Sequence, residues 1–262
     1  MCLVGIAIAH YADFPLVIVA NRDEFHDRPA QALHRWQDQP KIIAGRDLQA
    51  QGTWFGATTN GRLAVLTNIR GYPEPPADAI SRGALVTDFL ASELSALQWL
   101  LALQDKLSSY AGFNLIVSDN LRDIYLTSSH GGIKQLQAGV HALSNGRYGD
   151  PWPKTQKVCE ALTQCANPAS AQALQATLES RYQPPDADLP NTGVDIDKER
   201  LLAPALIVSD DYGTRATTVF QLNYQGEIVL TEYTRDIEGQ VISRAHESWR
   251  VGEFSDNPSE AR

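Results

Sequence analysis

The sequence predicts an α+β fold, a four-layer αββα sandwich of two mainly antiparallel sheets with helices on their outer faces. Short strands joined by tight turns dominate over strand–helix–strand units, which favours hairpins and antiparallel pairing. The helical stretches fall into two blocks that separate blocks of strands. The first strand is apolar on both faces, as expected for a strand covered by a second sheet on one side and by helices on the other.

The chain begins with the predicted central hairpin. Residues 3–9 place apolar side chains on both alternating faces, and residues 16–20 repeat this pattern after a short turn, so we expect the two strands to pair. The run Asn21-Arg22-Asp23-Glu24 follows directly. Charge at the end of a buried strand indicates either a solvated turn or a rim on which catalytic groups sit.

Further strands are predicted where apolar, β-branched and aromatic residues lie between turn signals. These strands comprise residues 42–44, 53–57, 63–67, 113–118, 124–128, 140–143, 217–224 and 228–233. Asn60-Gly61 is a strong hairpin signal between two of them, because both central positions of such a turn favour these residues.

Helices are predicted over residues 81–92, 93–104, 154–166 and 169–180. In the second helix Leu94, Leu97 and Leu101 share a face and are expected to pack against a sheet. Residues 183–200 are polar, acidic and proline-containing, which predicts a long surface loop that could cover a site. With no linker in view, residues 1–240 should form one domain, followed by a polar C-terminal tail over 241–262.

Composition argues against several classes of partner and site. The net charge is −9 without a block of Lys or Arg, which argues against a nucleic-acid partner. No apolar run approaches the roughly 18 residues of a membrane span, and no signal peptide is evident, so we expect a cytoplasmic protein without an integral membrane segment. The three cysteines, Cys2, Cys159 and Cys165, are too few and too scattered for a disulfide framework or a short-spaced zinc site. We predict neither a metal nor a cofactor.

Cys2 is the candidate nucleophile. Removal of Met1 would leave a thiol and a free α-amine on one residue, with ordinary pKa values of about 8.5 and 7.7–8.0. The amine could then take the thiol proton without help from a histidine. The alternatives are a cysteine that only fills the core, or a Cys–His pair, for which His141 is the nearest candidate by topology.

Several short motifs together resemble one family. They are the Met1-Cys2 start, the run at 21–24, Ser81-Arg82-Gly83 at a helix start and Tyr212-Gly213-Thr214-Arg215. This set resembles the NRDE family, also called the transport and Golgi organisation protein 2 family, from residue 2 to about 233. That family is similar to N-terminal nucleophile (Ntn) hydrolases, whose αββα fold matches the layers predicted above. The choloylglycine hydrolase and penicillin V acylase enzymes of that group cleave linear amides with an N-terminal cysteine.

Carried over position by position, this resemblance implies the catalytic residues Cys2, Arg22, Asp23, Asn68, Asn145 and Arg215. We expect substrate contacts from Asn21, Glu24 and Trp54. An arginine near the sulfur favours the thiolate, and side-chain amides can donate to the oxyanion formed at the attacked carbonyl. The relatives have Arg-Asn-x-Asp in place of Asn21-Arg22-Asp23-Glu24, so either Asp23 or Glu24 could be the active carboxylate.

The expected activity is acyl transfer from a small amide or acyl conjugate through Cys2. Members of the NRDE family have been connected with haem trafficking and lipid handling. The resemblance therefore also implies an alternative function, a carrier that holds haem or an acyl-lipid such as acyl-CoA without turning it over.

Overall fold

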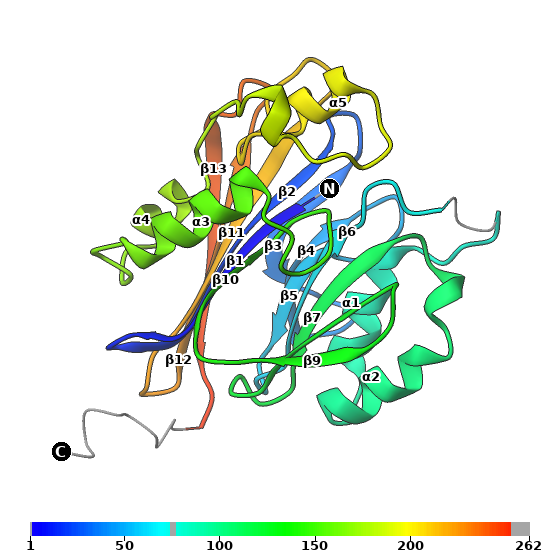
Figure 1. The fold of residues 1–262 in the computed structure, drawn as a ribbon. Coiled ribbons are helices and arrows are strands. Elements are labelled where there is room, and N and C mark those ends of the chain that lie inside the picture. Colours follow the sequence, from blue (N-terminus) through cyan, green and yellow to red (C-terminus); the bar gives the residue numbers. More distant parts are fainter. Residues whose placement is uncertain (1, 74–76, 253–262) are drawn as a thin grey trace.

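The computed structural model describes residues 2–73 and 77–252. Met1, part of the proline-rich loop (74–76) and the end of the predicted tail (253–262) lie outside the described residues. Within the described part, two antiparallel sheets of six and seven strands stack face to face, with helices on both outer sides (Figure 1). This arrangement confirms the predicted α+β class and the order of its layers.

The six-stranded sheet has the order β10-β1-β2-β11-β12-β13. Its strands are β1 (Cys2–Tyr11), β2 (Phe14–Phe25), β10 (Gly139–Leu143), β11 (Tyr212–Leu222), β12 (Glu227–Arg235) and β13 (Val241–Arg250). The seven-stranded sheet runs from β3 to β9 in chain order. Its strands are β3 (Ala30–Arg35), β4 (Ile42–Asp47), β5 (Phe55–Thr58), β6 (Leu63–Asn68), β7 (Phe113–Ser118), β8 (Ile124–Ser128) and β9 (Ile133–Leu136).

Buried apolar side chains of the described residues gather between adjacent layers. Ile6, Ile18 and Phe220 belong to the cluster between the two sheets. On one outer side α3 (Pro153–Thr163) and α4 (Ala171–Ala176) pack on the six-stranded sheet. On the other side α1 (Arg82–Ala91), α2 (Ala96–Gln104) and the short 3₁₀ turn η1 (Leu107–Ser109) cover the seven-stranded sheet. None of these described helices is long and apolar enough to cross a membrane.

Two predicted boundaries are wrong. The run at 21–24 lies inside β2 rather than after it, because β11 pairs with all four residues and β1 pairs with Asn21 and Arg22. The predicted polar tail contains a strand, β13, over its residues 241–250. In β13, Ala245 and Trp249 pack against the inter-sheet core. The apolar alternation of this edge strand is therefore weak in the sequence, and the strand is held mainly by its pairing with β12.

Two predictions need correction. Residues 183–200 are mostly exposed, as expected of a surface segment. They also include the 3₁₀ turn η2 (Asp186–Asp188) and most of α5 (Ile196–Leu201), and Glu199 of α5 is buried against Arg70. In α2 the residues that pack inward are Ala96, Leu100 and Leu103. Leu94, Leu97 and Leu101 are exposed, because the helix begins at residue 96 and turns a different stripe toward the sheet.

Candidate active site

Cys2 stands at the start of β1 and lines a cavity of about 280 Å³. Its pairing partner on β2 is Arg22, so both side chains leave the same face of the sheet, toward the second sheet. The Ser144 hydroxyl donates to the carbonyl oxygen of Cys2, at 3.2 Å. Cys2 is only 8% exposed, yet it is one of the residues that form the wall of the cavity.

The polar run of β2 is divided between two layers because successive strand side chains alternate. Arg22 and Glu24 point between the sheets, and Asn21 and Asp23 point toward the helices. Arg22, Asp23 and Glu24 line the cavity, whereas Asn21 is not among the lining residues. The substrate contact predicted for Asn21 thus has no counterpart in this arrangement.

Asn21 instead braces the strand from behind. Its side-chain nitrogen donates to the carbonyl oxygens of Ala205 at 2.8 Å and Leu178 at 3.2 Å. Its side-chain oxygen accepts a hydrogen bond from the Thr217 hydroxyl at 2.6 Å. With its amide satisfied and fully buried, Asn21 fixes the position of its neighbours in the run.

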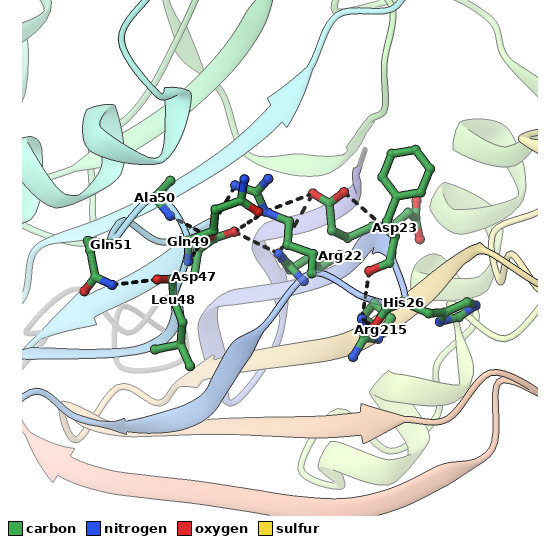
Figure 2. A network of polar contacts seen from close by, with 12 residues as sticks. Arg22, Asp23, His26, Asp47, Leu48, Gln49, Ala50, Gln51 and Arg215 are labelled. Carbon is green, nitrogen blue, oxygen red and sulfur yellow. Dashed lines mark hydrogen bonds and ion pairs between the residues drawn. The ribbon is translucent and has the colours of Figure 1, made fainter.

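Asp47, at the end of β4, organises the cationic side of the cavity (Figure 2). Its carboxylate accepts from Arg22 at 3.1 Å and from two nitrogens of Arg28 at 2.7 and 3.2 Å. Glu24 lies farther away, with 3.9 Å to Arg22 and 3.8 Å to Arg28. The Arg22 guanidinium also stacks over the Trp54 ring, at 4.4 Å from its centroid. Arg22 is consequently held rigidly beside Cys2 by charge and by an aromatic surface.

The surroundings of Cys2 act on its thiol in both directions. Burial raises the pKa of the Cys2 thiol, and the Asp23 carboxylate raises it further. The Arg22 guanidinium and a hydrogen bond from the Asp23 backbone lower it. The net effect favours the protonated thiol, so a nearby base is required before the sulfur can attack.

Asp23 belongs to a buried polar cluster behind Cys2. Its carboxylate accepts a hydrogen bond from the Thr214 hydroxyl at 2.7 Å, and its carbonyl oxygen accepts one from the Tyr212 hydroxyl at 2.8 Å. Burial raises the pKa of the Asp23 carboxyl, whereas the positive charges of Lys154 and Arg70 and the bond from Thr214 lower it. Burial dominates and the pKa of the Asp23 carboxyl is raised overall; the nearby cations favour its ionised form, in which the carboxylate could pair with an α-ammonium group.

Lys154 was missed by the sequence analysis. It occupies the first turn of α3, is almost fully buried, and donates to the carbonyl oxygen of Leu202 at 2.9 Å. Burial lowers the pKa of Lys154 to about 8, against the opposing effects of Asp23 and Cys2. Its position four residues before Val158, on the apolar stripe of α3, was the signal that could have identified it.

The two predicted oxyanion donors have different positions. Asn68 ends β6 and lines the cavity. Asn145 is fully buried and does not line it. The side-chain amide of Asn145 donates to the backbone oxygen of Asn68 at 2.9 Å, and its oxygen lies 3.2 Å from the Ser144 hydroxyl, whose one proton it shares with the carbonyl oxygen of Cys2. Asn145 therefore positions Asn68, and of the two residues Asn68 is the one that lines the cavity.

Arg215 does not reach the cavity lining. The pairing of β11 with β2 shifts register between Thr214 and Ala216, and such a bulge re-aims the extra residue. The Arg215 guanidinium donates to the carbonyl oxygens of Phe25 and His26, both at 2.8 Å (Figure 2). It thus ties the end of β2 to β11, away from the position that the resemblance implied.

His141 is also accounted for by other contacts. Its ring nitrogens lie 2.8 Å from the Tyr148 hydroxyl and 2.8 Å from the carbonyl oxygen of Gln137.

The sequence analysis assigned no role to three charged residues of the cavity lining, Arg28, Asp47 and Arg82. Within the described part of the chain, no group of three or more His, Cys, Asp or Glu side chains could hold a metal ion.

The fold is similar to two solved structures. One is a Caenorhabditis elegans N-acylethanolamine-hydrolyzing acid amidase (NAAA) ortholog, with a TM-score of 0.46 and 10% identity over 83% of this chain and 92% of that one. The other is the C2A mutant of the conjugated bile acid hydrolase from Clostridium perfringens, with a TM-score of 0.44 and 8% identity over 96% of this chain and 97% of that one.

Sequence relatives are much closer. A Bos taurus transport and Golgi organization protein 2 homolog is 31% identical over 239 residues, 84% of this chain and 86% of the relative. The Homo sapiens homolog is 30% identical over 241 residues with the same coverage, and the Drosophila melanogaster protein is 26% identical over 184 residues, covering 63% and 65%. The family model described as Transport and Golgi organisation 2 matches residues 1–236. The resemblance found in the sequence is confirmed, and the chain belongs to the Transport and Golgi organisation 2 family.

Proposed function

We propose that this protein is a cysteine hydrolase that cleaves a small amide or acyl conjugate by acyl transfer to N-terminal Cys2. The observation that carries the proposal is the placement of Cys2 at the wall of a cavity that Arg22 and Asn68 also line. A thiol, a cation and a side-chain amide around one small space are the groups that attack on a carbonyl requires.

Activation begins with the α-amine that removal of Met1 leaves on Cys2. This amine has an ordinary pKa of about 7.7–8.0, so at neutral pH it can take the thiol proton whose loss the buried environment opposes. Arg22 and the hydrogen bond from the Asp23 backbone stabilise the resulting thiolate. The Asp23 carboxylate, supported by Lys154, balances the ammonium group.

The thiolate then attacks the substrate carbonyl carbon, a C–S bond forms, and the π electrons move to the oxygen. Asn68 donates to this oxyanion. In comparable sites one such donor lowers the activation barrier by roughly 3–4 kcal/mol. When the C–N bond breaks, the ammonium gives its proton to the leaving amine. Water, deprotonated by the freed α-amine, hydrolyses the thioester and regenerates the Cys2 thiol.

Cysteine reactivity tests the proposal. We would label the purified protein with iodoacetamide from pH 5 to 10 and map the modified peptides, after intact-mass analysis establishes whether Met1 is absent. Cys159 and Cys165 are internal controls, since both are more exposed than Cys2. Faster labelling of Cys2 than of both controls at neutral pH is expected, together with a loss of that advantage in Arg22→Gln. Equal or slower labelling of Cys2 in Met1-free protein would contradict the proposal.

The carrier alternative makes a different prediction. The cavity at Cys2 lies near the lower end of the roughly 300–1,000 Å³ typical of ligand pockets, and no histidine is among the described residues that line it. A carrier of haem or acyl-CoA should bind its ligand equally well after Cys2→Ser and release it unchanged. Titration of wild-type and Cys2→Ser protein with haem and with acyl-CoA, followed by absorbance and fluorescence, separates the two functions.

A further inference from the structure

Arg82 has no role in the reaction proposed above. It is the first residue of α1 and belongs to the Ser81-Arg82-Gly83 motif. Its side chain lines the same cavity as Cys2. The hydrogen bond recorded for its guanidinium goes from Nη1 to the carbonyl oxygen of Gly112, at 3.2 Å. A guanidinium has five N–H donors, so as far as the described residues go most of its donor capacity is left for a ligand or for water.

The charges of the cavity lining explain why Arg82 differs from its neighbours. The charged residues described there are Arg22, Arg28, Arg82, Asp23, Glu24 and Asp47. Arg22 and Arg28 both pair with Asp47, and Glu24 lies within 4 Å of each of them. Among the described residues, no carboxylate forms an ion pair with Arg82. Its charge is therefore the least compensated of the three arginines.

Arg82 also acts close to the sulfur. Burial lowers the pKa of the Arg82 guanidinium, and among the charges that raise it that of Cys2 has the largest effect, ahead of that of Glu24. Because Arg82 and Cys2 line the same small cavity, a ligand anion bound by Arg82 would lie near the carbonyl carbon that Cys2 attacks. The cavity of about 280 Å³ leaves room for such a compact arrangement.

We propose that Arg82 is the specificity-determining residue of the cavity and that it binds a carboxylate of the substrate next to the scissile bond. The inference rests on the proposed function, and it narrows the substrate class to anionic amides. The carboxylate can lie on the leaving amine, as in N-acyl α-amino acids, or on the acyl group, as in succinyl amides. Both place an anion beside Arg82, where a bidentate guanidinium–carboxylate contact is favourable.

The paired reagents iodoacetate and iodoacetamide test carboxylate recognition directly. Both transfer a carbon to the Cys2 sulfur and release iodide, and they differ in the presence of a carboxylate beside the reacting carbon. We would measure both alkylation rates at Cys2 in wild type, Arg82→Gln, Arg82→Lys and Arg35→Gln. Arg35 is a half-exposed arginine of β3 that is absent from the cavity lining, so its variant controls for net charge.

The expected result is a fall of about tenfold in the iodoacetate-to-iodoacetamide rate ratio in Arg82→Gln, as for loss of one charge-assisted hydrogen bond. Arg82→Lys should fall less, and Arg35→Gln should match wild type. An unchanged ratio in Arg82→Gln overturns the inference. If the ratio is unchanged because both rates fall by the same factor, Arg82 acts on the thiol rather than on an anion.

A binding measurement distinguishes failure of this inference from failure of the proposed function. In Cys2→Ala protein, N-acetylalanine and succinamate should bind more tightly than the neutral N-acetylalaninamide and succinamide, and Arg82→Gln should remove the difference. If Cys2 is unreactive but this difference is present, the hydrolase proposal fails and the anion site stands. If charged and neutral ligands bind alike, the anion site fails whatever the reactivity of Cys2. The better of the two charged ligands identifies which side of the amide carries the carboxylate.

Discussion

Asp47→Asn is the substitution for which the structure gives the clearest expectation. The change keeps the side-chain shape and an acceptor for the backbone N–H groups of Gln49 and Ala50, which now donate to Oδ1 at 3.1 and 2.8 Å. It removes the charge that Arg22 and Arg28 share. Two guanidinium groups would then face each other and a neutral amide.

The magnitude follows from the burial of the partners. Removal of one member of a buried ion pair costs about 3–5 kcal/mol. Arg22 is 5% exposed and fits that case, but Arg28 is 27% exposed, and Glu24 remains 3.9 Å from Arg22. We therefore expect a loss near the lower limit, about 3 kcal/mol in the free energy of unfolding at pH 7.

This loss should depend on pH. Burial raises the pKa of the Asp47 carboxyl, but hydrogen bonds from Arg28 and from the Ala50 backbone, with the charges of Arg28 and Arg22, outweigh that effect and lower it. A carboxyl with a lowered pKa in the folded state stabilises the protein above its unfolded pKa of about 3.9. That contribution is lost as the pH falls through the folded-state pKa, so the difference between wild type and Asp47→Asn should begin to shrink below about pH 4 and vanish only below the folded-state pKa.

Urea unfolding followed by tryptophan fluorescence at pH 7 and at pH 3.5–4 measures both expectations. Asp38→Asn is the matched control, because Asp38 pairs with Arg46 but is 52% exposed, and it should cost less than about 1 kcal/mol. A cost of Asp47→Asn no greater than that of this control at pH 7 would contradict a structural role for the Asp47 charge. So would a difference from wild type that does not shrink in acid.

Three further changes test the packing around the site. Gly52→Ala should destabilise the protein by at least about 1–3 kcal/mol in urea unfolding, because its Cβ would lie 2.6 Å from the backbone carbon of Gly83; full wild-type stability would contradict this close contact. Glu199→Gln should cost about 3 kcal/mol at pH 7, since Arg70 is 4% exposed and would lose its charged partner, and a loss under 1 kcal/mol would show that water compensates Arg70. Leu101→Gln should change stability by less than about 0.5 kcal/mol, because Leu101 is 57% exposed, whereas a large loss would restore the packing first expected from its spacing.

Local patterns were sufficient for most of the fold. The β1–β2 hairpin and the β5–β6 turn depend on alternation and on Asn60-Gly61, which are properties of adjacent residues. The position of Cys2 beside Arg22 then follows from antiparallel pairing. The layers were predictable because β1 is apolar on both faces and the helices carry apolar stripes.

The remaining features depend on contacts that no local pattern contains. Arg215 turns away from the cavity because of a bulge at one position of β11. Glu199 becomes buried because Arg70, from a distant loop, pairs with it. Asp47 acquires its role from Arg22 and Arg28, two arginines that precede it by 25 and 19 residues and pair with its carboxylate. From the sequence alone such charged residues are predicted to lie on the surface, because their burial depends on partners far along the chain.

Acylation of Cys2 with a free and with a blocked amino terminus shows whether Cys2 acts as an N-terminal nucleophile. The protein would be produced with an N-terminal extension that a protease removes to leave Cys2 first, and both forms would be incubated with an acyl p-nitrophenyl ester. Intact-mass analysis and peptide mapping then follow the acyl group. We expect a transient acyl adduct on Cys2, with turnover, in the cleaved form and little or none in the blocked form or in cleaved Cys2→Ser. Equal acylation of Cys2 in the blocked form, or acylation of Cys159 and Cys165 alone, would contradict an N-terminal cysteine nucleophile.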